Sequence, residues 1–473
     1  MNIFKKKSLC AALAGIGALG AAGAAQAVNL NPDGLGQVLI YPYYTTRTDA
    51  AEHEFNSLLS VVNTTASAKA VKVRFLEGKN SREVLDFNLF LSPKDVWSAA
   101  VVPMDSGAGI LTTDVSCTLP AIPAGGKAFV NFAYSSDGGP TSLDRTKEGY
   151  VEIIEMASYL ETSTTAKNVT HVNGVPPGCA KQTDAQGLAD ALPPTGGLMG
   201  GMTLINVQSG SDYTADAVAL DNFSQNVLYT GAGVTTPDLT QANPSISVVV
   251  ANNNVYQSLW PAGPDAVIAV LMHDHIMNEY VLDAVTNSGT DWVVTMPTKR
   301  FYVFPGTGQP AELFQRNFNK TDGACDDVSL NIYDREENTT STPLDFSPPP
   351  PTVTNSLCWE ANVVTFNNSN VLGSTNVANV PTDFEHGWLD LGFFDPAAAP
   401  IHTIQAFPTA ITNIPTGQTA VTGATYQGLP VVGFAVQSFA NGAIHVGSEV
   451  VLSNYGGNFV HKGTRTITTG IAP

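Results

Sequence analysis

The stretch Val71-Lys72-Val73-Arg74-Phe75 decides the fold class, because apolar and charged residues alternate strictly along it. Successive side chains of a β-strand point to opposite faces of a sheet, so Val71, Val73 and Phe75 share one face. Residues 85–89 repeat the alternation with Leu, Phe and Leu. We therefore predict two neighbouring strands, each with one apolar face.

Similar short segments recur at residues 129–132, 150–154, 202–207, 245–251, 292–296, 328–333, 361–366, 387–393, 430–436 and 446–452. Turn residues, among them Asn441-Gly442 and Gly456-Gly457, punctuate these segments. The pattern favours an all-β, mainly antiparallel fold of β-sandwich-like domains with one or two short helices. The apolar spacing predicts a helix from Pro264 to about Asn278, followed by a hairpin of residues 280–286 and 291–297.

Shifts in composition divide the chain into four parts. We predict a signal peptide at 1–27, an N-terminal β-sandwich domain at 28–170, a loop or linker at 171–201 and a C-terminal β-rich domain at 202–473. The linker is rich in Pro and Gly. Residues 342–353 form a Pro-rich loop, for which a stiff spacer is a better interpretation than a ligand of SH3 domains.

Charged residues make up only 13% of the 473 residues, and 22 Lys and Arg face 41 Asp and Glu, for a net charge of −19. Nucleic-acid binding needs a basic surface, and docking on anionic lipid needs a basic patch. The charge argues against both classes. The hydrophobic content of 43% argues against intrinsic disorder.

The first 27 residues have the pattern of a cleaved secretory signal. Lys5, Lys6 and Lys7 precede an apolar run, and Ala25-Gln26-Ala27 offers a small-x-small cleavage site. We predict export through the Sec pathway and a mature chain that begins at Val28. Because no later stretch is long and apolar enough to span a membrane as a helix, we expect the protein at the cell surface, outside the cell or in the periplasm.

Four cysteines remain after the signal: Cys117, Cys179, Cys325 and Cys358. An even number in an exported chain predicts two structural disulfides, with three connectivities open. Pairing between sequence neighbours, Cys117 with Cys179 and Cys325 with Cys358, is the simplest. A zinc site has little support, because the chain contains no CxxC pair.

Two clusters of ionisable residues are candidates for chemistry. His273-Asp274-His275 would place both imidazoles on one face of a strand, as a metal requires, but on the predicted helix they diverge and form a solvated face. Asp383 and Glu385, with His386 and Trp388, have the composition of a glycosidase acid/base pair. Surface decoration is the simpler interpretation of that second cluster.

A calcium loop is the remaining metal hypothesis. Residues 317–323 approach the EF-hand spacing, but the Gly falls one position late and no Glu closes the loop. An irregular site of Asp322, Asp326 and Asp327 stays open. No nucleophile elbow, P-loop or dinucleotide motif occurs, so we assign no catalytic, cofactor-binding or metal residues and no cofactor, and we favour a protein that is not an enzyme.

The aromatic residues allow a sugar-binding surface or a core. Tyr41, Tyr43 and Tyr44 cluster near the mature N-terminus, and five Trp are scattered along the chain. Single Trp residues in β-sandwiches pack in the core more often than they bind sugars.

Several segments together resemble a known group of sequences. They are residues 36–44, Ser60-Val61-Val62-Asn63-Thr64, 71–77, 83–88, 149–156 and Asp291-Trp292-Val293-Val294-Thr295. The chain is similar over most of its mature length to uncharacterised exported proteins of Gram-negative bacteria that are commonly labelled cell-surface proteins. The resemblance implies a surface location and transfers no site residues.

We expect an exported, non-enzymatic structural or adhesive β protein that associates with itself or with other surface components. The segment after Val28 could be a strand donated between subunits, in which case deletion of residues 28–44 would abolish assembly but leave a folded body. The alternatives are a secreted protein that binds carbohydrate or another ligand and, third, a secreted hydrolase that uses carboxylates.

Overall fold

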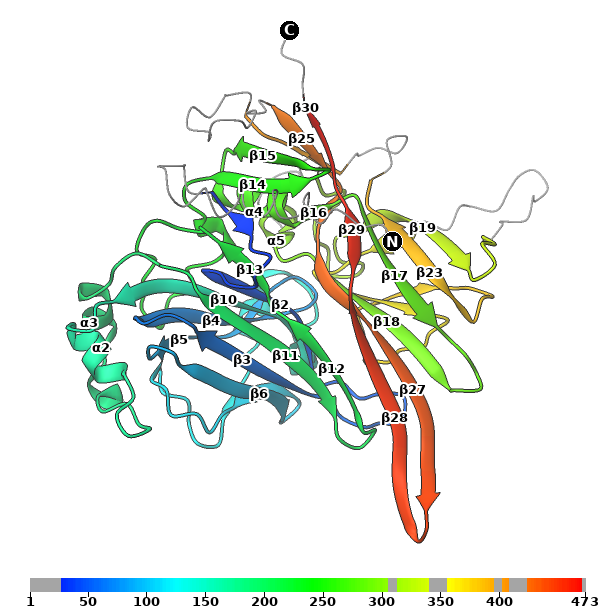
Figure 1. The fold of residues 1–473 in the computed structure, drawn as a ribbon, viewed down its shortest axis with the longest axis horizontal. Coiled ribbons are helices and arrows are strands. Elements are labelled where there is room, and N and C mark those ends of the chain that lie inside the picture. The colour runs from blue at the N-terminus through cyan, green and yellow to red at the C-terminus, as the bar shows by residue number, and fades with distance from the viewer. Residues whose placement is uncertain (1–26, 305–312, 340–354, 395–401, 408–422, 470–473) are drawn as a thin grey trace, which may run out of the picture.

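The computed structural model describes residues 27–304, 313–339, 355–394, 402–407 and 423–469, and it confirms the all-β, mainly antiparallel architecture. The predicted signal peptide, apart from Ala27, and the Pro-rich loop lie outside these residues. Figure 1 shows a β-sandwich formed by the first half of the chain, a second β-rich region beside it, and one long hairpin that extends from the body.

The first sheet of the sandwich has seven strands. In spatial order they are β1 (Asn29–Leu30), β13 (Val218–Asp221), β2 (Val38–Thr45), β10 (Glu148–Tyr159), β4 (Ala68–Glu77), β5 (Glu83–Leu91) and β8 (Thr118–Leu119). The stretch that predicted the fold lies in β4, where Val73 is opposite Phe87 of β5 and Ile153 of β10. All three are buried, as the alternation predicts.

The second sheet has six strands. They are β12 (Ser211–Asp216), β11 (Leu198–Asn206), β3 (Asn56–Asn63), β6 (Val96–Met104), β7 (Gly107–Leu111) and β9 (Lys127–Ala128). The core between the two sheets contains Tyr41, Tyr43, Tyr44 and Trp97, each fully buried. These aromatic residues therefore belong to the core and not to a sugar-binding surface.

The sheet pairing does not follow the predicted boundary between residues 201 and 202. β11 pairs along its whole length with β3, β12 pairs with β11, and β13 pairs with β2. Residues 202–221, which the sequence assigned to the C-terminal domain, thus complete both sheets of the sandwich. Only the long-range pairing reveals this, because β11 lies more than 130 residues from β3 along the chain.

The outer face of the seven-stranded sheet is also covered, although it carries charged residues. Lys72 and Arg74 of β4 are almost completely buried. The guanidinium of Arg74 forms ion pairs with Glu152 and, at 2.7 Å, with Glu83. Apolar residues of the same face, such as Ile154, join the core of the second half. The two halves therefore share a continuous interior.

The second half contains two five-stranded sheets. The first has the order β22 (Val377–Val380), β21 (Ala361–Phe366), β18 (Ser288–Thr295), β27 (Val432–Val446) and β28 (Glu449–Val460). The second has the order β20 (Asn355–Leu357), β19 (Asp326–Asp334), β23 (His386–Gly392), β17 (His275–Val281) and β29 (Lys462–Thr464). Three smaller sheets are β14 (Ile246–Ala251) with β15 (Asn254–Leu259), β16 (Met272–His273) with β26 (Leu429–Pro430), and β24 (Thr403–Gln405) with β25 (Ala424–Gln427) and β30 (Thr466–Thr469).

The described residues form four short α-helices instead of one or two: α2 (Thr164–Val169), α3 (Asp184–Ala189), α4 (Gly263–Leu271) and α5 (Arg300–Val303). Short 3-10 helices occur at Phe132–Ser136, Leu143–Lys147, Cys179–Lys181 and Leu239–Gln241.

The helix predicted at 264–278 ends earlier, at Leu271. Arg465 donates hydrogen bonds to the carbonyl oxygens of Val270 and Met272. In a longer helix these oxygens would accept hydrogen bonds from backbone amides of the next turn. Residues 272–281 instead form strands. The hairpin predicted at 280–297 is also wrong, because β17 and β18 belong to different sheets.

The segment after Val28 that was predicted as a donated strand forms β1, which pairs with β13 at the edge of the protein's own sheet. β2 lies between β13 and β10, and all eight of its residues are buried. Deletion of residues 28–44 would remove β1 and almost all of the internal strand β2, so the structure argues against the expectation that a folded body survives.

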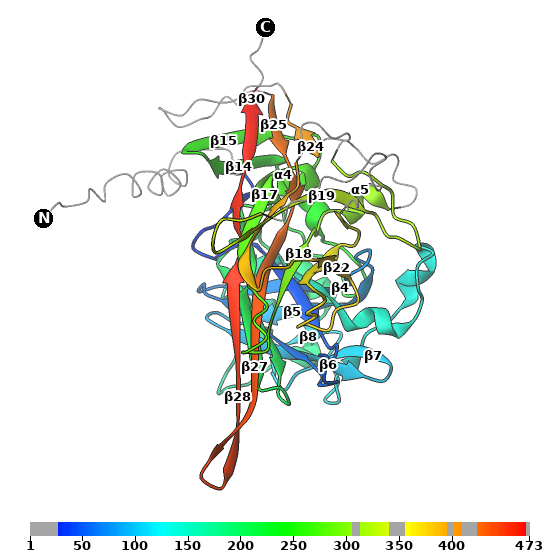
Figure 2. The same ribbon diagram turned by 90° about the vertical axis from the view of Figure 1, so that its right-hand side faces the viewer.

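β27 and β28 form a hairpin that extends well beyond the body (Figures 1 and 2). The turn predicted at Asn441-Gly442 is a β-bulge inside this hairpin, and the chain reverses at Gly447-Ser448. Gly442 has a φ of +76°, and its amide donates to Oδ1 of Asn454 at 3.0 Å. An Asn-Gly pair favours a bulge as well as a tight turn, because Gly accepts positive φ in both.

The disulfides connect Cys117 with Cys179 and Cys325 with Cys358, which confirms the pairing between sequence neighbours. Such bonds are typical of exported proteins. Of the described helices, none has the length and apolar character needed to cross a bilayer.

Reduction of the first disulfide should destabilise the protein measurably. Cys117 and Cys179 are 62 residues apart, and loss of a native bond of this kind costs roughly 2–4 kcal/mol. We expect a Cys117→Ser/Cys179→Ser variant to unfold at a lower urea concentration than the wild type. An unchanged midpoint would show that the unfolded chain is not constrained by this bond.

Candidate interaction site

The His273-Asp274-His275 cluster spans the junction of β16 and β17. Nδ1 of His275 lies 2.7 Å from Oδ1 of Asp390, whereas Nδ1 of His273 lies 2.9 Å from the carbonyl oxygen of Leu271. Asp274 accepts hydrogen bonds from the hydroxyls of Thr464 and Thr466. The three side chains therefore have separate partners, and the described residues contain no group of three that could hold a metal.

The Asp383, Glu385 and His386 cluster lies in the loop before β23 and at its first residue. His386 lies 3.7 Å from Asp283, and neither carboxylate faces either of the two grooves described below. Trp388 stacks on Tyr333 with ring centroids 4.5 Å apart and is 38% exposed. Tyr333 thus covers one of the two faces of the Trp388 ring.

The predicted calcium residues have other partners. Asp326 forms a buried ion pair with Lys299 at 2.7 Å and accepts a hydrogen bond from the amide of Gln315. Asp327 lies 3.8 Å from Arg316. Lys299 and Arg316 thus occupy the carboxylates of Asp326 and Asp327 that a calcium ion would need, so the structure does not support the irregular calcium site. A small groove of about 380 Å³ beside the second disulfide includes Asp322 and Arg316.

Two groups of Ser, His and Asp that the sequence does not bring together meet in the structure. In the first, Oγ of Ser209 lies 2.8 Å from Nδ1 of His53, and it donates to Asp49. Asp49 lies 3.5 Å from the same nitrogen. A catalytic triad needs Ser and Asp on opposite ring nitrogens. The arrangement is therefore structural.

The second group repeats this geometry. Ser92 and Asp95 both face Nδ1 of His171, at 2.5 Å and 3.6 Å. The hydroxyl of Ser92 also lies 3.1 Å from the carbonyl oxygen of Val169. No nucleophile is therefore activated here, and neither group supports a hydrolase.

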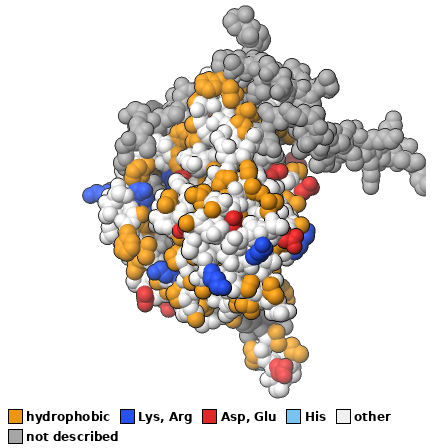
Figure 3. Space-filling model, turned by 90° about the vertical axis from the view of Figure 1, so that its left-hand side faces the viewer, with side chains coloured by type: hydrophobic (Ala, Val, Ile, Leu, Met, Phe, Trp, Pro, Cys, Tyr) orange, Lys and Arg blue, Asp and Glu red, His pale blue; other side chains and the backbone are white. Residues whose placement is uncertain are grey.

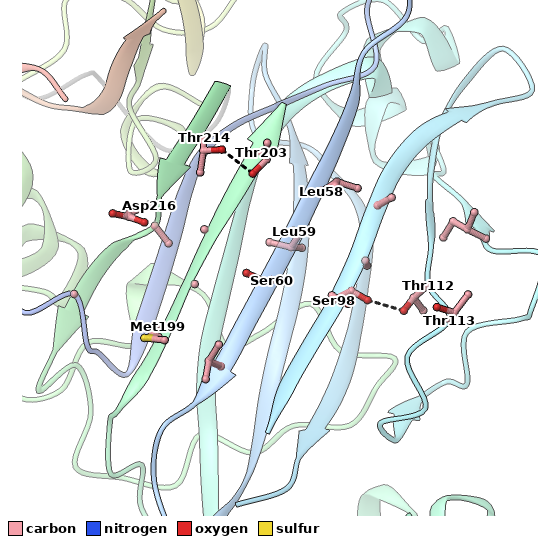
Figure 4. Close-up of a pocket in the computed structure, with 18 of the residues that line it drawn as sticks. Leu58, Leu59, Ser60, Ser98, Thr112, Thr113, Met199, Thr203, Thr214 and Asp216 are labelled. Atoms are coloured by element: carbon pink, nitrogen blue, oxygen red, sulfur yellow. Dashed lines mark hydrogen bonds between the residues drawn. The ribbon is translucent and has the colours of Figure 1, made fainter. Parts of the chain in front are cut away.

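The outer face of the six-stranded sheet carries a groove of about 750 Å³ (Figure 4), which we call the trough. Its floor follows from the strand register. Ser60 of β3 is opposite Ser98 of β6 and Gly201 of β11, so small residues form one row across three strands. Larger residues flank this row on both sides.

The flanking rows are mainly apolar. On one side Leu58 is opposite Ala100 and Thr203, and on the other Val62 is opposite Val96 and Met199. Leu58 and Met199 are 44% and 43% exposed. Contiguous exposed apolar residues mark interaction surfaces.

Few polar groups of the trough are free to bind a sugar. The hydroxyls of Thr203 and Thr214 bond each other at 2.9 Å, and Thr112 donates to the carbonyl oxygen of Ser98 at 2.6 Å (Figure 4). The lining contains no aromatic residue and only two ionisable ones, Asp33 and Asp216. An apolar occupant fits this lining better than a carbohydrate.

The second exposed apolar surface is the free part of the β27–β28 hairpin, residues 441–453, which we call the arm. Val446 and Val450 are 60% and 61% exposed, and Val451 is 44% exposed. Register places Val446 and Val451 on one face and Val450 on the other. Figure 3 shows hydrophobic and acidic atoms at this end of the molecule, and Glu449 is the acidic residue of the arm.

The base of the arm is held against the edge of the six-stranded sheet. Nδ2 of Asn454 donates to the carbonyl oxygen of Ser209 at 2.7 Å. A Cβ on Gly456 would lie 2.7 Å from the carbonyl oxygen of Asp212, so Gly allows the close approach of the two backbones. The arm therefore leaves the body in a defined direction.

No protein-family model matches the chain, and neither a curated protein nor a solved structure matches it.

Proposed function

We propose that the protein is an exported, non-enzymatic structural component of the cell surface that associates with copies of itself. The arm carries this proposal. An extended hairpin with apolar residues on both faces does not stabilise a monomer, because a solvated two-stranded ribbon is itself only marginally stable. Such a surface is stabilised when a partner covers it.

Other features support the same role. Two disulfides suit a protein outside the cytoplasm. The low share of charged residues reduces the cost of burying surface between subunits. The signal pattern at 1–27 and the resemblance to exported cell-surface proteins support the proposed location.

Substitution in the arm tests self-association. We expect the mature protein to sediment as an oligomer, and Val446→Asp/Val450→Asp to reduce the oligomer at least tenfold at the same concentration, because a carboxylate would have to be buried whichever face of the arm the contact covers. Light scattering after gel filtration measures the mass, and negative-stain electron microscopy shows whether the oligomer is a regular assembly.

Val285→Asp is the matched control, because Val285 is 92% exposed and lies in the loop between β17 and β18. This variant should assemble like the wild type. A wild-type protein that is monomeric at high concentration would contradict the proposal.

A further inference from the structure

We propose that two copies exchange arms, so that the arm of each copy lies in the trough of the other. This inference rests on the proposed function and names the partner surface. It starts from the fact that the arm and the trough are apolar surfaces of one molecule that do not cover each other. Figures 1 and 2 show the arm directed away from the body that carries the trough.

The dimensions of the two surfaces agree. Each strand of the arm has about six residues, so the arm is ~20 Å long. The trough crosses the sheet from Thr214 of β12 to Leu111 of β7. Between these two residues lie the adjacent strands β12, β11, β3, β6 and β7, which at the usual inter-strand spacing span ~19 Å. A ribbon laid across the row of small residues would therefore fill the trough, with its strands nearly perpendicular to those of the sheet.

The chemistry of the two surfaces also agrees. The centre of the trough has no charge, and the arm carries only His445 and Glu449 as ionisable residues. Val450 on one face of the arm matches the apolar flanks formed by Leu58 and Met199. Burial of such residues contributes about 25 cal/mol per Å² of apolar surface. His445 is the cross-strand neighbour of Val450, whereas Glu449 lies on the opposite face of the arm, so the contact buries no carboxylate of the arm.

The area indicates a reciprocal exchange. One face of a ribbon of this size buries roughly 500 Å² in total against the trough, which is below the ~1,000 Å² of a specific interface. Two such contacts reach that range. Because the base of the arm lies next to β12, at the edge of the sheet that bears the trough, a two-fold axis beside this edge brings both arms over both troughs.

Cross-linking tests the inference on the mature full-length protein. Val450→Cys places a thiol on the arm, and Ser98→Cys places one on the floor of the trough, while the four native cysteines are held in disulfides. After treatment with a short bismaleimide, a mixture of the two variants should give a covalent dimer, and each variant alone should not. Val285→Cys mixed with Ser98→Cys is the control and should remain monomeric on a denaturing gel.

Each result separates this inference from the proposed function. A covalent dimer of Val450→Cys alone would mean that arms pack on arms, which overturns the trough contact and leaves self-association intact. A double variant Val450→Cys/Ser98→Cys should stop at the dimer, whereas a ladder of trimers and tetramers would overturn the reciprocal exchange. Monomeric wild-type protein by light scattering would overturn both proposals.

Discussion

Replacement of Glu148 by alanine is expected to lower the free energy of unfolding by about 3–5 kcal/mol, which is the cost of breaking a buried ion pair from one side. Glu148 of β10 is buried and pairs with Arg47 at 3.1 Å. Its carboxylate also accepts hydrogen bonds from the hydroxyls of Tyr43, Ser374 and Thr375 and from the amide of Thr375. The side chain thus joins the sandwich to the second half of the chain.

The same contacts predict how this contribution depends on pH. Burial by itself would raise the pKa of Glu148, but Arg47 and the donors of Ser374 and Thr375 together hold the pKa below its usual value. The stabilisation is therefore present above the pKa of the unfolded chain, near 4.5, and is lost as the pH falls through the lower pKa of the folded state.

Urea unfolding at pH 7 measures the effect. Glu161→Ala is the matched control, because Glu161 is exposed and should change the free energy of unfolding by less than about 0.5 kcal/mol. A loss below about 1 kcal/mol in Glu148→Ala would show that the network does not hold the two halves together.

Glu360 should have the opposite dependence on pH. It is 1% exposed, so its carboxylate is almost completely removed from water. Burial raises its pKa from 4.5 to about 8, against the opposing effect of Lys299 and Arg300. Between these two values the folded state binds a proton that the unfolded state releases, so stability falls as the pH rises through this window.

We expect Glu360→Gln to remove this loss. A shift of this size corresponds to on the order of 5 kcal/mol at most, so the variant should equal the wild type near pH 4.5 and exceed its stability by several kcal/mol at pH 8. The melting temperature between pH 5 and 9 measures the difference. Glu337→Gln, at an exposed position, should follow the wild-type curve. Parallel curves for Glu360→Gln and the wild type would contradict the expectation.

The sequence could predict the class of fold because alternation is a local property. The stretch at 71–75 lies in β4, and the strands predicted at 292–296 and 361–366 correspond to β18 and β21. Cysteine number and spacing led to the observed disulfides in the same way. The resemblance to cell-surface proteins and the export signal stay predictions, since nothing in the fold tests them.

Predictions that depended on distant partners were wrong. The helix at 264–278 ends at Leu271 because Arg465, almost 200 residues away, takes the carbonyl groups that would continue it. The boundary predicted between residues 201 and 202 falls inside β11, which pairs with β3. Asn441-Gly442 forms a bulge and not a turn, because β27 and β28 pair with each other both before and after it.

The sequence by itself determined an all-β chain with two disulfides, a low charge and the pattern of an exported protein, since each of these is a matter of composition or local periodicity. Only the tertiary structure decided where interaction surfaces lie. The trough exists because register aligns Ser60, Ser98 and Gly201 from strands far apart in the chain. The arm exists because β27 and β28 pair beyond the sheet that anchors them, and a one-dimensional pattern does not contain that length.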